Sequence, residues 1–260
     1  SGEVVDPLGQ TPRPEFLCHG FLALDLQRTS HELHDRFFGG ATRLLDDGGH
    51  LFGFCPGRIV TSFPKGFGIP ILSNEPLIAQ AMFANQFAEE PVPVRVKWTF
   101  RYVLNRDLQR PLKPLFVRVE CVRTDVGLHF VVKPGRQVNR TVVTRKLALP
   151  RDTTLHYIGS HLHAFGESVA LRDVTTGQTL FTSHAIPFPD RPDIAFLEAF
   201  SSEQGIPVYK DHDYEMVSVY NNTTQTDQMG MACLRLYGLD STFTMPNLTP
   251  ISHDDGEAHR

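Results

Sequence analysis

The segment His161-Leu162-His163 is the part of the sequence whose residue types and spacing point most directly to chemistry. Side chains at positions i and i+2 of an extended strand lie on the same face, so this segment sets two imidazoles side by side. A thioether from Met229, far along the chain, would complete a site with two nitrogen donors and one sulfur donor. Imidazole suits copper and soft sulfur favours Cu(I), so the sequence predicts a copper site. The alternative interpretation is that the histidines decorate a strand surface and that Met229 packs in a core.

Further residues compete for a place in or around such a site. Met231 would share the face of Met229 in an extended strand and is its rival for the thioether position. Tyr157 and Glu167 are alternatives for holding the second ring nitrogens, a contact that metal-bound histidines usually make. Three more histidines have other interpretations. His184 is a supporting group or an alternative ligand. His156 is a structural residue on the opposite strand face, and His129 is a core or edge residue.

Short strands joined by turns are expected to position these groups. Aromatic and β-branched residues dominate the periodic stretches, and 20 glycines and 19 prolines punctuate the chain. The segment 74–83 is ambiguous, because Asn74 and Pro76 suit the start of a helix whereas 78–86 also fits a strand. The fold class predicted from this pattern is all-β. Strands are predicted over residues 94–102, 141–147, 167–173, 214–220 and 231–237.

The polar segment 105–114, which carries two prolines, is the best candidate for a linker between domains. It divides the chain into an N-terminal β-sandwich over residues 1–110 and a C-terminal β-sandwich over residues 111–250. The last residues, 251–260, are predicted to form a frayed tail.

Composition restricts the classes of partner and the compartment. The chain has 260 residues, of which 41% are hydrophobic and 21% charged, so a globular protein is expected. Its net charge is −4 and its basic residues are scattered, so nucleic acid is not an expected partner. No apolar stretch reaches the roughly 20 residues needed to span a membrane. Four cysteines permit two disulfides or four thiols, and glycosylation tripeptides favour a secreted glycoprotein; they begin at Asn139, Asn221, Asn222 and Asn247.

A series of short motifs follows the order found in one enzyme family. The motifs, in addition to His161-Leu162-His163, are Phe16-Leu17-Cys18, Phe37-Phe38-Gly39-Gly40, Phe63-Pro64-Lys65-Gly66-Phe67-Gly68, Lys133-Pro134-Gly135 and Thr226-Asp227-Gln228-Met229. With these motifs, the chain resembles the copper type II, ascorbate-dependent monooxygenases, the superfamily of peptidylglycine α-hydroxylating monooxygenase and dopamine β-monooxygenase. The resemblance covers most of the chain, and no single motif is specific.

The resemblance implies two antiparallel jelly-roll-type sandwiches in tandem, each with one copper. Its second copper, which binds O2 and hydroxylates a C–H bond, would be held by His161, His163 and Met229. Its first copper needs three histidines, and here only part of that set is present. The remnant of the first site comprises His31, His34 and Asn85, with His19 and His50 as further candidates nearby. We interpret the first site as having lost its copper.

Residues on the substrate side also depart from the family pattern. The resemblance places an arginine two residues before the His-x-His, where it anchors a peptide carboxylate, but this chain has Gly159. The Asn and Tyr expected after the methionine appear as Met231 and Cys233. A peptidylglycine substrate is therefore not expected.

Two functional hypotheses follow. In the first, the protein is a secreted copper hydroxylase that activates O2 at one mononuclear site and takes electrons from ascorbate, another external reductant or a partner protein. In the second, it is a non-catalytic extracellular structural or binding module that keeps one copper site or none. A carbohydrate-binding sandwich is a variant of the second hypothesis, but the one tryptophan, Trp98, falls on a predicted strand and forms no aromatic platform. The substrate is a small molecule that the sequence does not identify.

Overall fold

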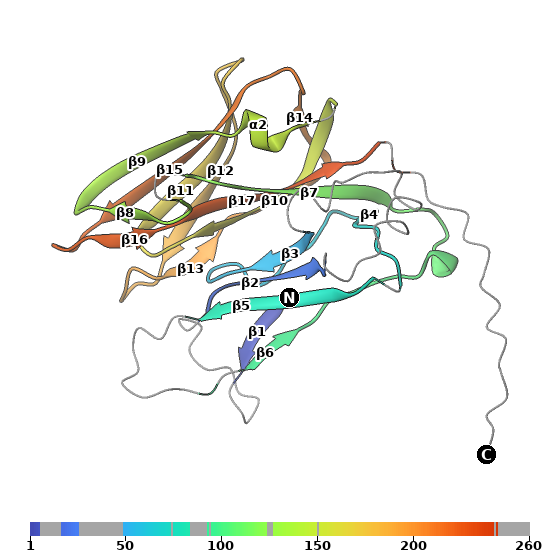
Figure 1. The fold of residues 1–260 in the computed structure, drawn as a ribbon, viewed down its shortest axis with the longest axis horizontal. Helices are drawn as coiled ribbons and strands as arrows, with labels where there is room; N and C mark the ends of the chain where they lie inside the picture. Colours follow the sequence, from blue (N-terminus) through green and yellow to red (C-terminus); the bar gives the residue numbers. More distant parts are fainter. Residues whose placement is uncertain are drawn as a thin grey trace.

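The computed structural model describes residues 1–5, 17–25, 49–73, 75–83, 93, 95–123, 127–149, 151–241 and 243. Strands dominate these residues, so the all-β prediction is confirmed (Figure 1). The helical segments described are a 3-10 turn, η2 (Asn105–Asp107), and a single helical turn, α2 (Thr144–Leu147). The strands are β1 (Gly2–Val5), β2 (Leu17–Leu24), β3 (His50–Phe54), β4 (Phe67–Gly68), β5 (Leu77–Phe83), β6 (Arg95–Trp98), β7 (Lys113–Cys121), β8 (Phe130–Val132), β9 (Gly135–Val142), β10 (Thr153–Leu162), β11 (Gly166–Asp173), β12 (Gln178–Pro187), β13 (Ile194–Leu197), β14 (Phe200–Val208), β15 (Tyr214–Asn222), β16 (Gln228–Gly230) and β17 (Ala232–Leu239).

Three sheets stack as layers around two apolar cores. A central sheet has the order β14-β10-β17-β7-β4, an outer sheet has the order β13-β12-β11-β15-β9, and a three-stranded sheet has the order β3-β2-β5. Two-stranded ladders join β1 to β6 and β16 to β8. In Figure 1, the three-stranded sheet lies on the side of β10, β17 and β7 that faces away from β9, β11 and β12.

The central sheet is buried on both faces, because each core takes alternate residues of its strands. On one face, Ile158 and Leu236 pack with residues of the outer sheet in the larger core. On the other face, Tyr157 and Tyr237 pack with Leu51 of β3 in the smaller core. Nearly every residue of β10 and β17 is therefore buried, and polar residues on these strands need partners inside the protein.

Several strand predictions are confirmed and two need correction. Strands occupy 166–173, 214–222 and 232–239, close to the predicted bounds. Within the ambiguous segment 74–83, residues 77–83 form strand β5, which pairs with β2. The predicted strand over 141–147 is wrong beyond Val142, because Thr144 bonds Tyr214 and begins the helical turn α2, whose Leu147 enters the larger core. The predicted strand over 94–102 is limited to β6.

The proposed linker joins segments that share one sheet and one core. β4, which precedes residues 105–114 in the chain, pairs in parallel with β7. It therefore extends a sheet whose other strands all come later in the chain than β4. Leu24 and Leu51 likewise pack with Leu115 and Val117. The division at residue 110 stays a prediction.

The cysteines take two different states in the described structure. Cys121 on β7 and Cys233 on β17 form a disulfide across neighbouring strands, 112 residues apart in sequence. Cys18 and Cys55 are free thiols. The sequence left open two disulfides or four thiols. The structure has neither of these arrangements, because it contains one disulfide and two thiols. Among the described residues, no helix is long and apolar enough to cross a membrane.

Candidate metal centre

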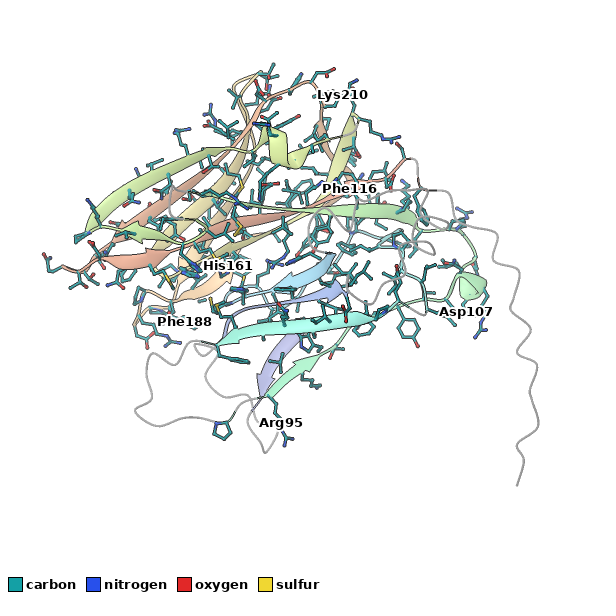
Figure 2. All side chains as sticks on the ribbon, viewed as in Figure 1. Arg95, Asp107, Phe116, His161, Phe188 and Lys210 are labelled. Carbon is teal, nitrogen blue, oxygen red and sulfur yellow. A yellow bond between two sulfur atoms is a disulfide. The ribbon has the colours of Figure 1, made fainter. Side chains whose placement is uncertain are left out.

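The central sheet places both predicted histidine ligands on the face that looks towards the three-stranded sheet. In β10, Tyr157, Gly159 and His161 alternate onto one face, and His163 follows just after the strand ends. The rings of His161 and His163 lie with their centroids 5.1 Å apart. The predicted side-by-side placement of the two imidazoles is therefore present. Figure 2 shows His161 where β10 faces β2 and β3.

Strand β2 brings two further donors, Cys18 and His19, to this face. Adjacent residues of a regular strand point to opposite faces, but the pairing of β2 with β5 shifts register between Leu17 and His19. An irregularity of this kind re-aims side chains. As a result, the donor atoms of Cys18, His19 and His161 all lie within 4.8 Å of one another.

Distances around the Cys18 sulfur resemble those between ligands of one metal ion. Its Sγ lies 3.2 Å from Nδ1 of His19 and 3.5 Å from Nε2 of His163. A tetrahedral ion with a sulfur at about 2.3 Å and a nitrogen at about 2.1 Å sets these two donors about 3.6 Å apart. The observed spacing therefore suits a centre with one sulfur donor and several nitrogen donors.

The hydrogen bonds of the two His-x-His rings agree with a metal-binding role. Nδ1 of His163 lies 3.3 Å from the carbonyl oxygen of Met229. If Nδ1 carries the proton, it donates to this carbonyl and leaves the Nε2 lone pair directed at Cys18, the arrangement that ligand histidines commonly have. His161 is only 3% exposed, and neither of its ring nitrogens has a hydrogen-bond partner. A metal ion would supply the missing partner.

Burial keeps the imidazoles neutral and the thiol protonated in the free protein. Burial first, and then the neighbouring His163, lowers the pKa of His161 well below its ordinary value. Burial, followed by His129, lowers the pKa of His163 to about 4. Burial raises the pKa of Cys18 to about 11, and the nearby Cys55 adds to this effect. The neutral imidazoles are ready to coordinate a cation, whereas Cys18 must release a proton to do so.

The structure assigns Met229 a different contact from the predicted one. Its side chain is 56% exposed, and its contact with His163 is made by the backbone carbonyl. Its rival Met231 is buried beside the disulfide, where it packs with Leu128. The sulfur donor that the described structure brings to the histidines is instead Cys18, which sequence reasoning did not propose as a ligand. The one available signal was the Cys18-His19 pair within an apolar segment.

The predicted remnant of a first copper site, His31, His34 and Asn85, lies outside the described residues. The two further candidates for that site are described. His19 belongs to the cluster with Cys18, and its ring centroid lies 5.2 Å from that of His161. His50 stacks on Phe21 with centroids 4.2 Å apart.

The other residues considered as ligands or supports have partners of their own. His156 lies 2.7 Å from the Thr154 hydroxyl and 2.9 Å from the Ser202 carbonyl, which agrees with the structural role predicted for it. Two of the remaining residues form side-chain pairs, His184 with Glu198 and Glu167 with Arg136. Tyr157 packs against Phe63 and Tyr237. His129 is exposed, and its ring centroid lies 5.6 Å from that of His163.

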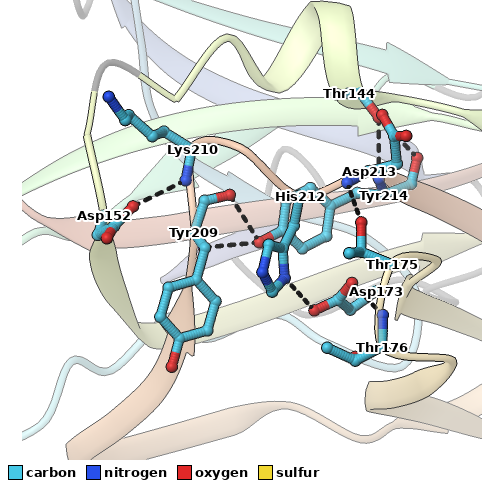
Figure 3. Close-up of polar contacts among 10 residues, drawn as sticks. All are labelled: Thr144, Asp152, Asp173, Thr175, Thr176, Tyr209, Lys210, His212, Asp213 and Tyr214. Atoms are coloured by element: carbon cyan, nitrogen blue, oxygen red, sulfur yellow. Dashed lines mark hydrogen bonds and ion pairs between the residues drawn. The ribbon is translucent and has the colours of Figure 1, made fainter.

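A second polar cluster contains a His–Asp pair and stabilises two turns (Figure 3). His212 Nδ1 lies 2.7 Å from Asp173, whose carboxylate also accepts the Thr176 backbone N–H. The Asp213 backbone N–H donates to the hydroxyl of Thr175. These bonds join the β11–β12 turn to the turn before β15, so the cluster has a structural explanation.

Comparisons of this chain with known proteins identify no family for it. No family model matches the chain, and no curated protein matches it. Among solved structures, the chain is similar to the infectious bursal disease virus VP2 subviral particle, with 8% identity and a TM-score of 0.26. It is also similar to the structure of the Gx strain of that virus, with 9% identity and a TM-score of 0.24. Each match covers 93% of this chain and 56% of the viral chain, so the chain spans little more than half the length of these proteins. TM-scores this low carry no inference about function.

Proposed function

We propose that this protein binds one copper ion through Cys18, His19 and His161, with His163 as the fourth donor. The observation that carries the proposal is the buried His161 ring, whose two nitrogens lack partners while a thiol and two more imidazoles surround it. Thiolate and imidazole together suit Cu(I) and Zn(II) and exclude hard ions such as Ca²⁺. We choose copper because the motif order resembles that of copper enzymes.

A centre with this donor set links two layers of the fold. Cys18 and His19 come from β2, whereas His161 comes from β10 and His163 directly follows that strand, more than 140 residues later. Four protein donors leave no open position for O2, as in structural metal sites. We therefore propose a non-catalytic copper module whose bound ion stabilises the packing of β2 on the central sheet.

The location proposed for this module is extracellular. The Cys121–Cys233 disulfide supports this part of the proposal, because disulfides persist mainly in oxidising compartments. The tandem jelly-roll arrangement and the N-linked glycans expected from the sequence belong to the same proposal.

The second candidate function is a copper hydroxylase whose ligands are His161, His163 and Met229. It is favoured by the position of Met229, whose backbone carbonyl lies beside His163 and which is exposed, since an open site must reach solvent. Such an enzyme would take electrons from ascorbate or another external reductant. The two candidates require different sulfur donors, so they make opposite predictions for mutants.

Metal analysis of purified protein loaded with Cu(I) separates the candidates. We expect one copper per chain in wild type and in Met229→Leu, and a loss of tight binding in Cys18→Ser and His161→Ala. His184→Ala, which removes an exposed histidine outside the cluster, is the control and should keep its copper. Retained copper in Cys18→Ser with loss in Met229→Leu would support the hydroxylase site instead. Displacement of copper by equimolar zinc would contradict the choice of metal.

A further inference from the structure

Two buried arginines lie next to each other between the central sheet and β3. Arg58 and Arg235 are each only 6% exposed. A Cβ at Gly53 would collide with the guanidinium of Arg235, and a Cβ at Gly159 would lie 2.7 Å from the Cζ of Arg58. Arg58 also donates to the carbonyl oxygen of Gly53. Both guanidinium groups thus lie against Gly53, in space that two glycines leave open.

These two positive charges have no carboxylate partner among the residues that the structure describes. The groups that act on the charge of Arg235 are Arg58, Cys55, Tyr157 and Tyr237, and Arg235 in turn acts on His50, His161 and His19. Burial, and next the like charge of Arg58, lower the pKa of Arg235. A buried charge without an opposite charge is costly, by several kcal/mol even after relaxation. An anion bound beside the two arginines would supply the missing opposite charge.

The hydrogen bonds show that Arg235, rather than Arg58, is the arginine that lacks partners. Arg58 is well satisfied, with two donations to the Ser160 carbonyl oxygen and one each to Gly53 and Thr61. Arg235, in contrast, has no partner for its Nε or its Nη1, although both atoms are buried.

His50 adds a third unpartnered nitrogen in the same region. Its buried Nδ1 also has no partner. His50 begins β3, three residues before Gly53, against which the Arg235 guanidinium lies. Burial, and next the charge of Arg235, lower the pKa of His50 to about 4. Buried polar groups in native proteins nearly always have partners, so unpartnered nitrogens on two neighbouring side chains mark a place where something binds.

We propose that Arg235, supported by the charge of Arg58 and by a hydrogen bond from His50, binds a small inorganic anion such as chloride or nitrate. The anion would accept the N–H groups of Arg235 and neutralise part of the buried charge. The burial of these three nitrogens favours a small ion over a phosphate ester or a carboxylate side chain. The proposal does not depend on copper, because none of the three residues belongs to the proposed metal centre.

Thermal unfolding of metal-free protein tests the proposal. Sodium chloride or sodium nitrate is titrated from 1 to about 300 mM at constant ionic strength, with sodium gluconate as the balancing salt. We expect the midpoint to rise by about 5 °C when the anion exceeds its dissociation constant a hundredfold. Arg235→Leu should abolish this rise. Arg172→Leu, which removes an arginine paired with Glu215 on the outer sheet, should keep it.

The outcomes are distinguishable from those of the copper experiment. The anion site would be overturned if the melting midpoint rose equally with anion concentration in wild type and in Arg235→Leu, or if it did not rise in wild type. Either result would leave the copper proposal intact. If Arg235→Leu does not fold, ³⁵Cl NMR of wild type and Arg235→Lys decides the question. We then expect chloride line broadening that nitrate removes in wild type, and about tenfold weaker binding in the lysine variant. No broadening in wild type, or unchanged binding in the lysine variant, would refute the proposal.

Discussion

Replacing Tyr220 with Phe should destabilise the protein and also weaken metal binding at the proposed centre. Tyr220 of β15 is fully buried, and its hydroxyl donates to the Met231 carbonyl at 2.6 Å. The same oxygen accepts the backbone N–H of His163 and that of Met231, each at 3.3 Å. One phenol therefore holds the chain at His163, directly after β10, and at Met231, directly before β17.

The expected cost follows from the bonds that the substitution removes. The Met231 carbonyl keeps the His163 N–H at 3.1 Å, but the Met231 N–H loses its partner inside the protein. One lost hydrogen bond and one stranded buried group together cost about 3 kcal/mol. For a chain of this size the melting midpoint should fall by about 6–12 °C. Because His163 loses part of its support, copper affinity should also fall, by about 10- to 100-fold.

Two measurements check this prediction. Unfolding followed by circular dichroism gives the change in stability, and competition with a Cu(I) chelator gives the change in affinity. Tyr102→Phe is the control, since Tyr102 is 74% exposed and its variant should match wild type in both assays. A Tyr220→Phe protein within about 0.5 kcal/mol of wild type would refute the bonding argument. A destabilised variant with unchanged affinity would refute the role in positioning His163.

Three more perturbations test other parts of the structure. Gly53→Ala should lower stability by about 1–3 kcal/mol in a urea titration, because its methyl group would displace the Arg235 guanidinium. Burial alone would raise the pKa of Asp173, but the hydrogen bonds from His212 and Thr176 and the charge of His212 together outweigh it and lower that pKa. This carboxylate therefore stabilises the fold above pH ~4 and loses the effect as the pH falls further. Asp173→Asn should remove that acid-dependent part of the unfolding free energy, and an unchanged acid profile would contradict it. Removing the disulfide between β7 and β17 should cost about 2–5 kcal/mol in chemical unfolding.

Local patterns predicted the parts of this fold that depend on local sequence. The period-two spacing of His161 and His163 correctly placed both rings on one face. The same reasoning found β11, β15 and β17, whose alternating residues face one core. It failed after Val142, because the Thr144 side chain bonds a residue 70 positions away, which no local pattern reveals.

The approach of Cys18 to the histidines was missed for a physical reason of the same kind. Regular strand geometry sends the side chains of Cys18 and His19 to opposite faces, so residue spacing offers no ground to pair them. Their convergence depends on the shift in register between β2 and β5, and their approach to His161 depends on stacking of distant strands. Neither can be read from residue spacing along one strand.

The burial of the central sheet on both faces makes its polar residues informative. Apolar side chains of similar size at the positions of His161 and Arg235 would fill this interior without unpartnered nitrogens, and such replacements are often neutral or stabilising. A fold selected for stability alone has no reason to keep them. Both residues nevertheless keep buried nitrogens without partners, on the same face and two strand positions apart. The two proposed ligands, a metal ion at His161 and an anion at Arg235, would supply the missing partners and account for both residues with the same physical argument.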